Sequence, residues 1–327
     1  MILVTGGAGF IGSNLVAALA EHGERTVVCD RLRQQDKWRN LAKADVLELV
    51  APEQLGSWLE QHGDAVAALV HLGAISSTTA TDVDLIVEVN VRLSWSLWQW
   101  CARHGKRFIY ASSAATYGAG EHGFTDDARR EALLRLRPLN AYGWSKHFFD
   151  RRVARAAADG EPVPPQWAGL KFFNVYGPNE YHKGTMQSVV ALKYPAVAAG
   201  RPLTLFKSYR RDCADGEQQR DFVFVDDCVA VILWLLEHPA VNGLFNVGAG
   251  QARSFNDLAQ LLFRAAGKPP QIEYIDMPEP IRAAYQYRTE APMERLRAAG
   301  FDRAPTPLEA GVPHYVERYL ARADRYR

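Results

Sequence analysis

Tyr142 and Lys146 have the residue types and the spacing needed for proton transfer. They lie four residues apart in AYGWSKHFFD, a stretch that we predict to be helical, so both side chains point from one helix face. A phenol titrates at about 10 and is a poor base at neutral pH, but a neighbouring ammonium stabilises the phenolate and lowers that pKa. Ser112 and Ser113 end the strand predicted before this helix, and their hydroxyls can hold a substrate oxygen.

A second group of proton-carrying side chains lies in NVYGPNEYHKGTM, residues 174–186. Glycine and proline interrupt this segment so often that we predict neither a core helix nor a central strand there. Lys183 can act as an acid or base, but it can also be a phosphate-binding or a solvated lysine. His182 can orient a substrate, although a histidine on a polar loop is often a bystander.

A glycine-rich turn, TGGAGFIG, follows the first predicted strand and opens the first predicted helix. Gly7, Gly9 and Gly12 match G-x-G-x-x-G, and Gly6 adds a further glycine to the turn. Such a turn lets backbone N–H groups approach a pyrophosphate at the helix N-terminus. With Asp30 at the end of the second predicted strand, the pattern indicates a dinucleotide-binding site.

The residues around Asp30 leave two dinucleotides open. A carboxylate at this position suits the ribose 2′-hydroxyl of NAD, whereas arginine nearby accommodates the 2′-phosphate of NADP. Arg31, Arg33 and Lys37 follow Asp30 in the sequence. They can bind that phosphate, or they can form an ordinary solvated basic face.

Short apolar runs alternate with amphipathic stretches in the first half of the chain. We predict strands at residues 1–5, 26–30, 66–74, 106–113 and 170–175, with helices at 10–23 and 85–105 between them. This alternation is typical of an α/β fold, a Rossmann-like doubly wound parallel sheet. We expect a dinucleotide-binding domain at 1–174 and a smaller α/β substrate-binding domain at 175–327, and the segment near 221–250 can return to the first.

The second half contains shorter elements separated by turns. We predict strands within 220–225, 243–250 and 271–277, a helix opened by Ser254, a final helix with an internal proline, and an exposed loop over 208–220.

Composition excludes several classes of partner. The 38 basic and 37 acidic residues give a formal net charge of +1, which offers no general attraction to nucleic acid or to an anionic membrane. The four cysteines form no CxxC pair and have no metal-site spacing, so we expect no metal and a reducing compartment. The sequence shows neither a secretion signal nor an apolar run long enough to span a bilayer, and we expect a cytoplasmic protein.

Three motifs, TGGAGFIG, YASSAATYG and YGWSK, resemble the extended short-chain dehydrogenase/reductase family over nearly the whole chain. The resemblance implies a catalytic triad of Ser113, Tyr142 and Lys146, with Lys146 also binding the nicotinamide ribose. Sugar 4,6-dehydratases of this family carry an acidic pair after a threonine before the YG of the serine strand. Residues 114–116 are Ala-Ala-Thr here, which argues against a dehydratase.

Within that family, SSTT (76–79), NVYGPNEYHKGTM and RDFVFV resemble the ADP-L-glycero-D-manno-heptose 6-epimerase subfamily. The resemblance implies NADP, an ADP-heptose substrate, a role in supplying heptose for the lipopolysaccharide core, and a homo-oligomer. It makes Lys183 a second acid/base residue beside the cofactor. The implied cofactor contacts are Gly6, Gly9, Phe10, Ile11, Gly12, Asp30, Arg31, Lys37, Leu72, Gly73, Ala74, Ser76, Asn90, Tyr142, Lys146, Val175 and Lys183. The implied substrate contacts are Ser113, Asn174, His182, Thr185, Phe206, Ser208, Arg220 and Tyr285.

The chain departs from the subfamily in two places. Ala51-Pro52-Glu53 stands where the subfamily has another cofactor-contacting lysine, and the loop Ser208–Gln219 is longer than usual. Two alternatives therefore stay open: a UDP-hexose 4-epimerase that uses NAD, and a nucleotide-binding regulator that has lost its chemistry.

Overall fold

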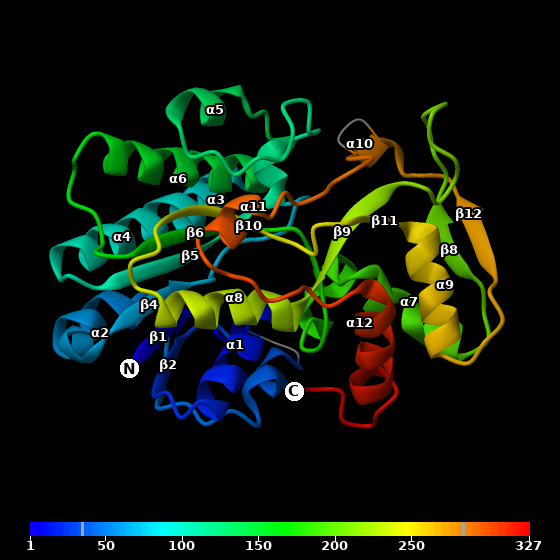
Figure 1. The fold of residues 1–327 in the computed structure, drawn as a ribbon. Coiled ribbons are helices and arrows are strands. Elements are labelled where there is room, and N and C mark those ends of the chain that lie inside the picture. Colours follow the sequence, from blue (N-terminus) through cyan, green and yellow to red (C-terminus); the bar gives the residue numbers. More distant parts are fainter. Residues whose placement is uncertain (34–35, 283–284) are drawn as a thin grey trace.

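The computed structural model describes residues 1–33, 36–282 and 285–327, and a seven-stranded parallel sheet forms its centre (Figure 1). The strand order is β10-β6-β5-β4-β1-β2-β3. The strands are β1 (Ile2–Thr5), β2 (Thr26–Cys29), β3 (Glu48–Val50), β4 (Ala68–His71), β5 (Arg107–Ser113), β6 (Trp167–Phe172) and β10 (Gly243–Val247). The order reverses between β1 and β4, and ligands of open α/β sheets bind at such a switch point. The predicted doubly wound fold is confirmed.

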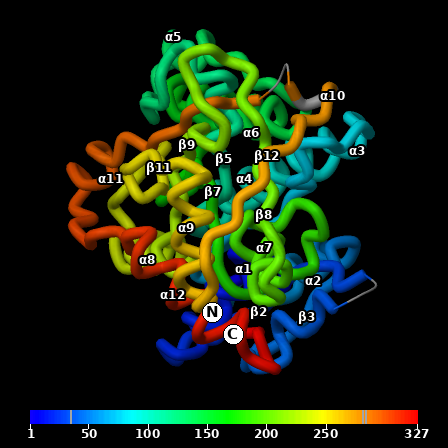
Figure 2. The backbone as a smooth tube through the Cα atoms, turned by 90° about the vertical axis from the view of Figure 1, so that its right-hand side faces the viewer, coloured from blue at the N-terminus to red at the C-terminus, as the bar shows by residue number. Residues whose placement is uncertain are grey.

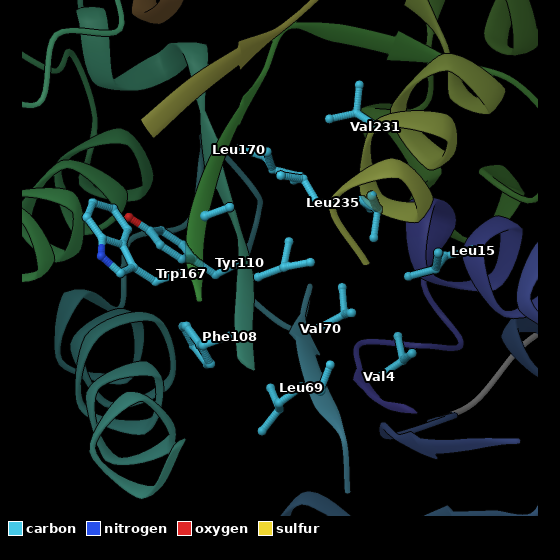
Figure 3. Close-up of a cluster of buried hydrophobic side chains, with 14 of the residues drawn as sticks. Val4, Leu15, Leu69, Val70, Phe108, Tyr110, Trp167, Leu170, Val231 and Leu235 are labelled. Atoms are coloured by element: carbon cyan, nitrogen blue, oxygen red, sulfur yellow. The ribbon is translucent and has the colours of Figure 1, made fainter. Parts of the chain in front are cut away.

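Helices cover both faces of this sheet (Figure 1). They are α1 (Phe10–Glu21), α2 (Leu55–His62), α3 (Val83–Val87), α4 (Leu93–Arg103), α6 (Ala141–Ala158) and α8 (Val225–Glu237). Figure 3 shows Trp167 and Phe108 on the face toward α4, and Leu15, Val231 and Leu235 on the opposite face. Because both faces are buried, the strands consist of nearly continuous apolar runs, which is why they were predictable.

The strand predicted at residues 170–175 is wrong as a single element. β6 ends at Phe172, and β7 (Asn174–Tyr176) begins after Phe173 in a separate sheet. The backbone N–H of Phe173 still bonds the carbonyl of Val247, at 3.1 Å, but the N–H of Val175 turns back to Phe173 O at 3.0 Å. The chain thus leaves the large sheet at Phe173, which places Asn174 beyond its edge.

A smaller assembly follows, visible at the front of Figure 2. Its strands are β7, β8 (Leu203–Phe206), β9 (Gln219–Phe224), β11 (Ala252–Ser254) and β12 (Ile272–Ile275). They form a three-stranded sheet, β11-β9-β7, and a pair, β12-β8, beside α7 (Val189–Ala198), α9 (Phe255–Ala265) and α12 (Leu308–Tyr315). These elements surround a second hydrophobic cluster. Ser254 opens α9 with a capping box to Asp257, as its position predicts.

Two predicted helices contain a wider turn that periodicity did not reveal. The helix predicted at 85–105 runs from α3 into α4 through a π turn, η4 (Glu88–Arg92), and α12 continues into a second π turn, η7 (Val316–Leu320). The other short helices are η1 (Asp36–Leu41), η2 (Pro52–Gln54), η3 (Gly63–Ala65), η5 (Ala114–Tyr117), α5 (Arg130–Arg135), η6 (Tyr181–Met186), α10 (Glu279–Arg282) and α11 (Glu294–Ala298). Within the described residues, every helix is too short or too polar to cross a membrane.

The strands β3, β8 and β11 were not predicted; β3 and β11 have three residues each, and β8 has four. β10 pairs with β6 in the large sheet, whereas β9 belongs to the three-stranded sheet, and the return of the segment near 221–250 to the first domain stays a prediction. The boundary at residue 174 between two domains stays a prediction.

Candidate active site

A cavity of about 470 Å³ opens where β1, β4, β5 and β6 end. It is lined by the turn after β1, by Leu72–Ala74 after β4, by Ala111–Ser113 in β5 and by Phe172–Tyr176. The carboxyl ends of these parallel strands therefore meet at the switch point of the sheet, the usual position of a ligand in this architecture.

The glycine turn fits a dinucleotide at this place. Gly6 has φ +69°, and a Cβ there would lie 2.5 Å from Gly73 N. A Cβ at Gly12 would lie 2.1 Å from Gly6 O, so glycine is required for the turn and helix to meet. Gly6, Gly9 and Gly12 line the cavity together with Phe10 and Ile11 at the start of α1. The free N–H groups of this helix end suit a diphosphate.

Asp30 and Lys37 form one side of the cavity. Asp30 accepts hydrogen bonds from Ala8 N at 3.0 Å, Arg31 N at 2.7 Å and Lys37 Nζ at 2.6 Å. Arg31 does not line the cavity; its exposed guanidinium instead bonds Glu53, with Nε 2.8 Å from the carboxylate. Glu53, one of the residues that depart from the subfamily, thus binds Arg31, which the resemblance assigned to the cofactor.

Ser113, Tyr142 and Lys146 meet at the cavity, as predicted. Asn140 caps α6 through Gly143 N at 2.8 Å, which places Tyr142 in its first turn. Lys146 Nζ donates to Ala111 O at 2.8 Å, and burial lowers the pKa of Lys146 to about 8.

The predicted lowering of the Tyr142 pKa by Lys146 is not observed. Burial raises this pKa, a hydrogen bond with Ser113 lowers it, and the charge of Asp150 raises it. In this arrangement the desolvation of the phenolate outweighs the favourable contact, because burial always disfavours the charged form. Tyr142 is thus a protonated phenol at neutral pH, and Ser113 lines the same cavity.

Lys183 and His182 reach the same cavity from η6. The ammonium of Lys183 lies 5.2 Å from the ring centre of Phe10, and burial lowers its pKa while Glu180 raises it. Glu180 is fully buried and accepts from Ser188 Oγ at 2.7 Å and from Tyr315 OH at 3.2 Å. His182 Nδ1 lies 3.2 Å from Asn40 Nδ2. Burial, with Lys37 and Lys183 nearby, lowers its pKa to about 4, so His182 is neutral at pH 7.

The predicted substrate residues separate into two groups. Asn174 and His182 line the cavity, whereas Phe206, Arg220 and Tyr285 form a cluster outside it. Arg220 is buried, its guanidinium lying 5.0 Å from the ring centre of Tyr285 and 5.6 Å from that of Phe255. Phe206 and Tyr285 contact edge to face, with centroids 6.5 Å apart. Phe255 itself lines the cavity, so the cluster borders it.

Three further predicted residues lie away from the cavity lining. Thr185 is exposed on η6. Ser208 holds the long loop, since its N–H donates to Asp215 Oδ1 at 2.6 Å. Asn90 is buried in the π turn, where its amide nitrogen donates to Ile75 O and to Ser145 Oγ, both at 3.0 Å, so it supports the cavity wall from behind.

The other predicted cofactor residues, Leu72, Gly73, Ala74, Ser76 and Val175, do line the cavity. Sequence reasoning missed the residues that support the site: Glu180 below Lys183, Asn40 beside His182, and the buried charges Asp150 and Lys171. Lys171 carried a signal, because a lysine inside the apolar run LKFFNV needs a partner. The described residues contain no group of three or more His, Cys, Asp or Glu side chains placed to hold a metal.

Comparison with known proteins agrees with this geometry. Residues 2–248 match the model of the NAD dependent epimerase/dehydratase family. The ADP-L-glycero-D-manno-heptose-6-epimerase of Nitratidesulfovibrio vulgaris (strain DP4) is 50% identical over 331 positions, covering 100% of both chains. The solved structure of the Helicobacter pylori ADP-L-glycero-D-manno-heptose-6-epimerase is 28% identical with TM-score 0.77, over 97% of this chain and 95% of that one.

A solved UDP-glucose 4-epimerase of Thermus thermophilus, in complex with NAD, is 26% identical with TM-score 0.75, over 97% of each chain. The family resemblance stated from the motifs is confirmed. The chain belongs to the NAD dependent epimerase/dehydratase family and is an epimerase.

Proposed function

We propose that this chain inverts C6 of ADP-D-glycero-D-manno-heptose to give the L-glycero epimer, with NADP as its bound cofactor. The observation that carries the proposal is that Tyr142 and Lys183 line one cavity. Two separate acid/base groups suit a reaction in which a substrate oxygen changes position between oxidation and reduction.

The glycine turn, Asp30 and Lys37 would hold the cofactor, with Lys146 at its nicotinamide ribose. When bound, the nicotinamide accepts a hydride from the sugar carbon and returns it. The free N–H groups at the start of α1 bind the diphosphate, and the Asp30 carboxylate, already bonded to Lys37 at 2.6 Å, remains able to accept from a ribose hydroxyl.

Tyr142 handles the proton of the first half-reaction. Tyr142 first loses its own proton to solvent, and the phenolate oxygen then takes the proton of the C6 hydroxyl while a hydride leaves C6, which gives a phenol and a ketone. Lys146, charged at neutral pH, favours the phenolate that must be present before this transfer. Ser113 orients the same oxygen.

Lys183 handles the second half-reaction. Inversion requires the opposite face of the ketone to be reduced, which rotation of the exocyclic arm about C5–C6 achieves. Rotation exchanges the ketone oxygen with the hydroxymethyl group and moves that oxygen away from Tyr142. Lys183 then donates the proton, and its pKa, lowered by burial, makes the ammonium a stronger acid than an exposed lysine.

The cluster of Phe206, Arg220 and Tyr285 suits the nucleotide diphosphate part of a substrate bound beside the cavity. A buried guanidinium such as Arg220 can bind phosphate oxygens through two parallel hydrogen bonds, and Phe206 and Tyr285 offer ring faces and edges for a base. We assign the ADP part of the substrate to this cluster. The four free cysteines suit the cytoplasm, where we place the reaction. The homo-oligomer stays a prediction.

NADP in place of NAD is supported by the basic residues beyond Asp30. Lys37 lines the cavity, and Arg31 is the neighbouring guanidinium that a 2′-phosphate can recruit. Glu53 opposes this use of Arg31 because the two already form an ion pair.

Proton NMR of ADP-D-glycero-D-manno-heptose mixed with the purified protein, without added cofactor, tests the proposal. Conversion to a mixture of C6 epimers supports the reaction, the substrate and a retained cofactor together. Unchanged heptose, with UDP-galactose converted under the same conditions, would instead identify a UDP-hexose 4-epimerase that uses a single tyrosine.

A further inference from the structure

A buried ion pair lies behind the Ser113–Tyr142–Lys146 site. Lys171 of β6 and Asp150 of α6 are both fully buried, with Lys171 Nζ 2.5 Å from Asp150 Oδ2. Lys171 also donates to Thr116 Oγ1 at 2.8 Å. Replacement of a buried pair by apolar residues is often neutral or stabilising, so such a pair is weak evidence for a stabilising role. The position of the Asp150–Lys171 pair next to Ser113, Tyr142 and Lys146 suggests a role in the reaction instead.

Asp150 connects the two elements that carry the reacting side chains. Tyr142, Lys146 and Asp150 follow one another at four-residue intervals on α6 and therefore share a helix face. Across from that face, Asp150 accepts from Ser112 Oγ of β5 at 2.7 Å. Ser112 directly precedes Ser113, and it lies opposite Lys171 in the β5–β6 register.

The charge of Asp150 also acts on the reacting groups. Burial lowers the pKa of Lys146 to about 8, and Asp150 is the charge that opposes this shift. A buried lysine without a nearby carboxylate loses its proton more readily. Lys146 must be positive to stabilise the Tyr142 phenolate, so the carboxylate preserves the form that the reaction uses.

Few other charges face this pair at neutral pH. His71 of β4, against Lys146, and His147 of α6, against Asp150, have pKa values lowered by burial to about 3 and about 4, so both are neutral. Burial raises the pKa of Tyr110 and of Tyr117, which are neutral as well. Asp126 is a further carboxylate near the pair, since burial raises its pKa and the charge of Lys171 lowers it.

We propose that Asp150 is a positioning residue for this site: its buried carboxylate keeps Lys146 in the charged form and anchors the strand end that carries Ser113. Lys171 is the counter-charge that holds the carboxylate in the core. The inference rests on the proposed function for the catalytic use of Lys146, but the protonation of Lys146 can be measured without any substrate.

Competitive acetylation with acetic anhydride, read by peptide mass spectrometry over a pH series, reports the neutral fraction of Lys146. We expect a midpoint of about 8 in the wild type. It should fall by about one pH unit in Asp150→Asn and in the double variant Asp150→Asn/Lys171→Met. The double variant removes both members of the Asp150–Lys171 pair, so neither is left as an unpaired buried charge, and it therefore carries the test if the single variant does not fold. An unchanged midpoint in the folded variants would overturn the inference.

Asp227→Asn is the matched control. Asp227 is another buried carboxylate, which accepts from Thr306 N at 2.8 Å and from Thr306 Oγ1 at 3.0 Å. We expect this variant to lose stability without moving the Lys146 midpoint. An equal shift in the control would assign the effect to loosened packing and reject a role specific to Asp150.

The alkaline limb of kcat/KM for the heptose gives a second readout. The limb should move to lower pH by the same amount as the acetylation midpoint, because loss of the Lys146 proton ends activity. An inactive wild type with a shifted midpoint in the variants contradicts the proposed function and leaves the role of Asp150 standing. An active wild type with an unshifted midpoint in the folded variants supports the proposed function and overturns the role of Asp150.

Discussion

Tyr142 and Lys183 line the same cavity although they come from α6 and η6, on opposite sides of the point where the chain leaves the large sheet. Burial raises the pKa of Tyr142 and lowers that of Lys183. At neutral pH the first is a phenol, and the lowered pKa of Lys183 makes its ammonium a stronger acid than that of an exposed lysine. One cavity thus holds two proton-transfer groups of different character, and the proposed reaction uses Tyr142 as a base after it has lost its proton and Lys183 as an acid.

Tyr142→Phe tests the first proton transfer. Loss of the phenol oxygen should lower kcat by at least about 100-fold, the scale of a lost acid/base group, with the amount of bound nucleotide unchanged. Tyr274→Phe is the control, since its hydroxyl bonds Asn256 at 3.0 Å on the surface. Similar kcat values in the two variants would remove Tyr142 from the chemistry.

Arg220→Met tests the proposed diphosphate contact. Without the buried guanidinium, KM for the nucleotide sugar should rise by about tenfold or more while bound cofactor stays constant. The exposed Arg264 of α9 provides the comparison as Arg264→Met. The assignment fails if KM is the same in both variants.

Glu53→Gln tests the competition for Arg31. An exposed ion pair is weak because solvent screens it, so its loss should raise the affinity for NADP relative to NAD by only about threefold. Competition binding of the two nucleotides to the cofactor-depleted protein measures this ratio. Arg31→Met should lower the ratio instead. If neither substitution alters it, Arg31 does not contact the 2′-phosphate.

His147→Gln tests a pH dependence of stability. Burial lowers the pKa of His147 to about 4, below the value of about 6.5 expected in the unfolded chain. Between these values the unfolded chain binds more protons, so the free energy of unfolding falls as pH decreases, by up to roughly 3 kcal/mol. Below about pH 4 the contribution is lost.

Urea unfolding at pH about 7 and about 5 measures this effect. The drop between the two values should shrink in His147→Gln and persist in His22→Gln, which changes an exposed histidine. Equal drops in the two variants would show that His147 is not the titrating group.

Local backbone demands made the cofactor turn predictable from the sequence. Gly6 needs a positive φ and Gly12 a contact without Cβ, and both demands are met within a few residues of chain. The Tyr142–Lys146 spacing is local for the same reason. Prediction failed at Phe173, where the chain bends because its N–H bonds a strand 74 positions later, Val247; apolar character continues across this bend and hides it.

The sequence also did not predict which charged residues pair when the partners are distant in the chain. Arg31 bonds Glu53, and Asp150 bonds Lys171, across elements that only the fold brings together. Periodicity carries no information on such pairs. A lysine inside an apolar strand does show that a partner is needed, but not which residue provides it.

Whether Lys183 is a second acid/base group is tested most directly by proton NMR of the heptose mixed with Lys183→Met and, separately, with Lys106→Met. Lys106 donates to Asp64 O at 2.9 Å, outside the cavity. We expect Lys106→Met to form the C6 epimer at the wild-type rate. Lys183→Met should form it at least about 100-fold more slowly with its cofactor still bound. Equal rates in the two variants would contradict a second acid/base group at Lys183.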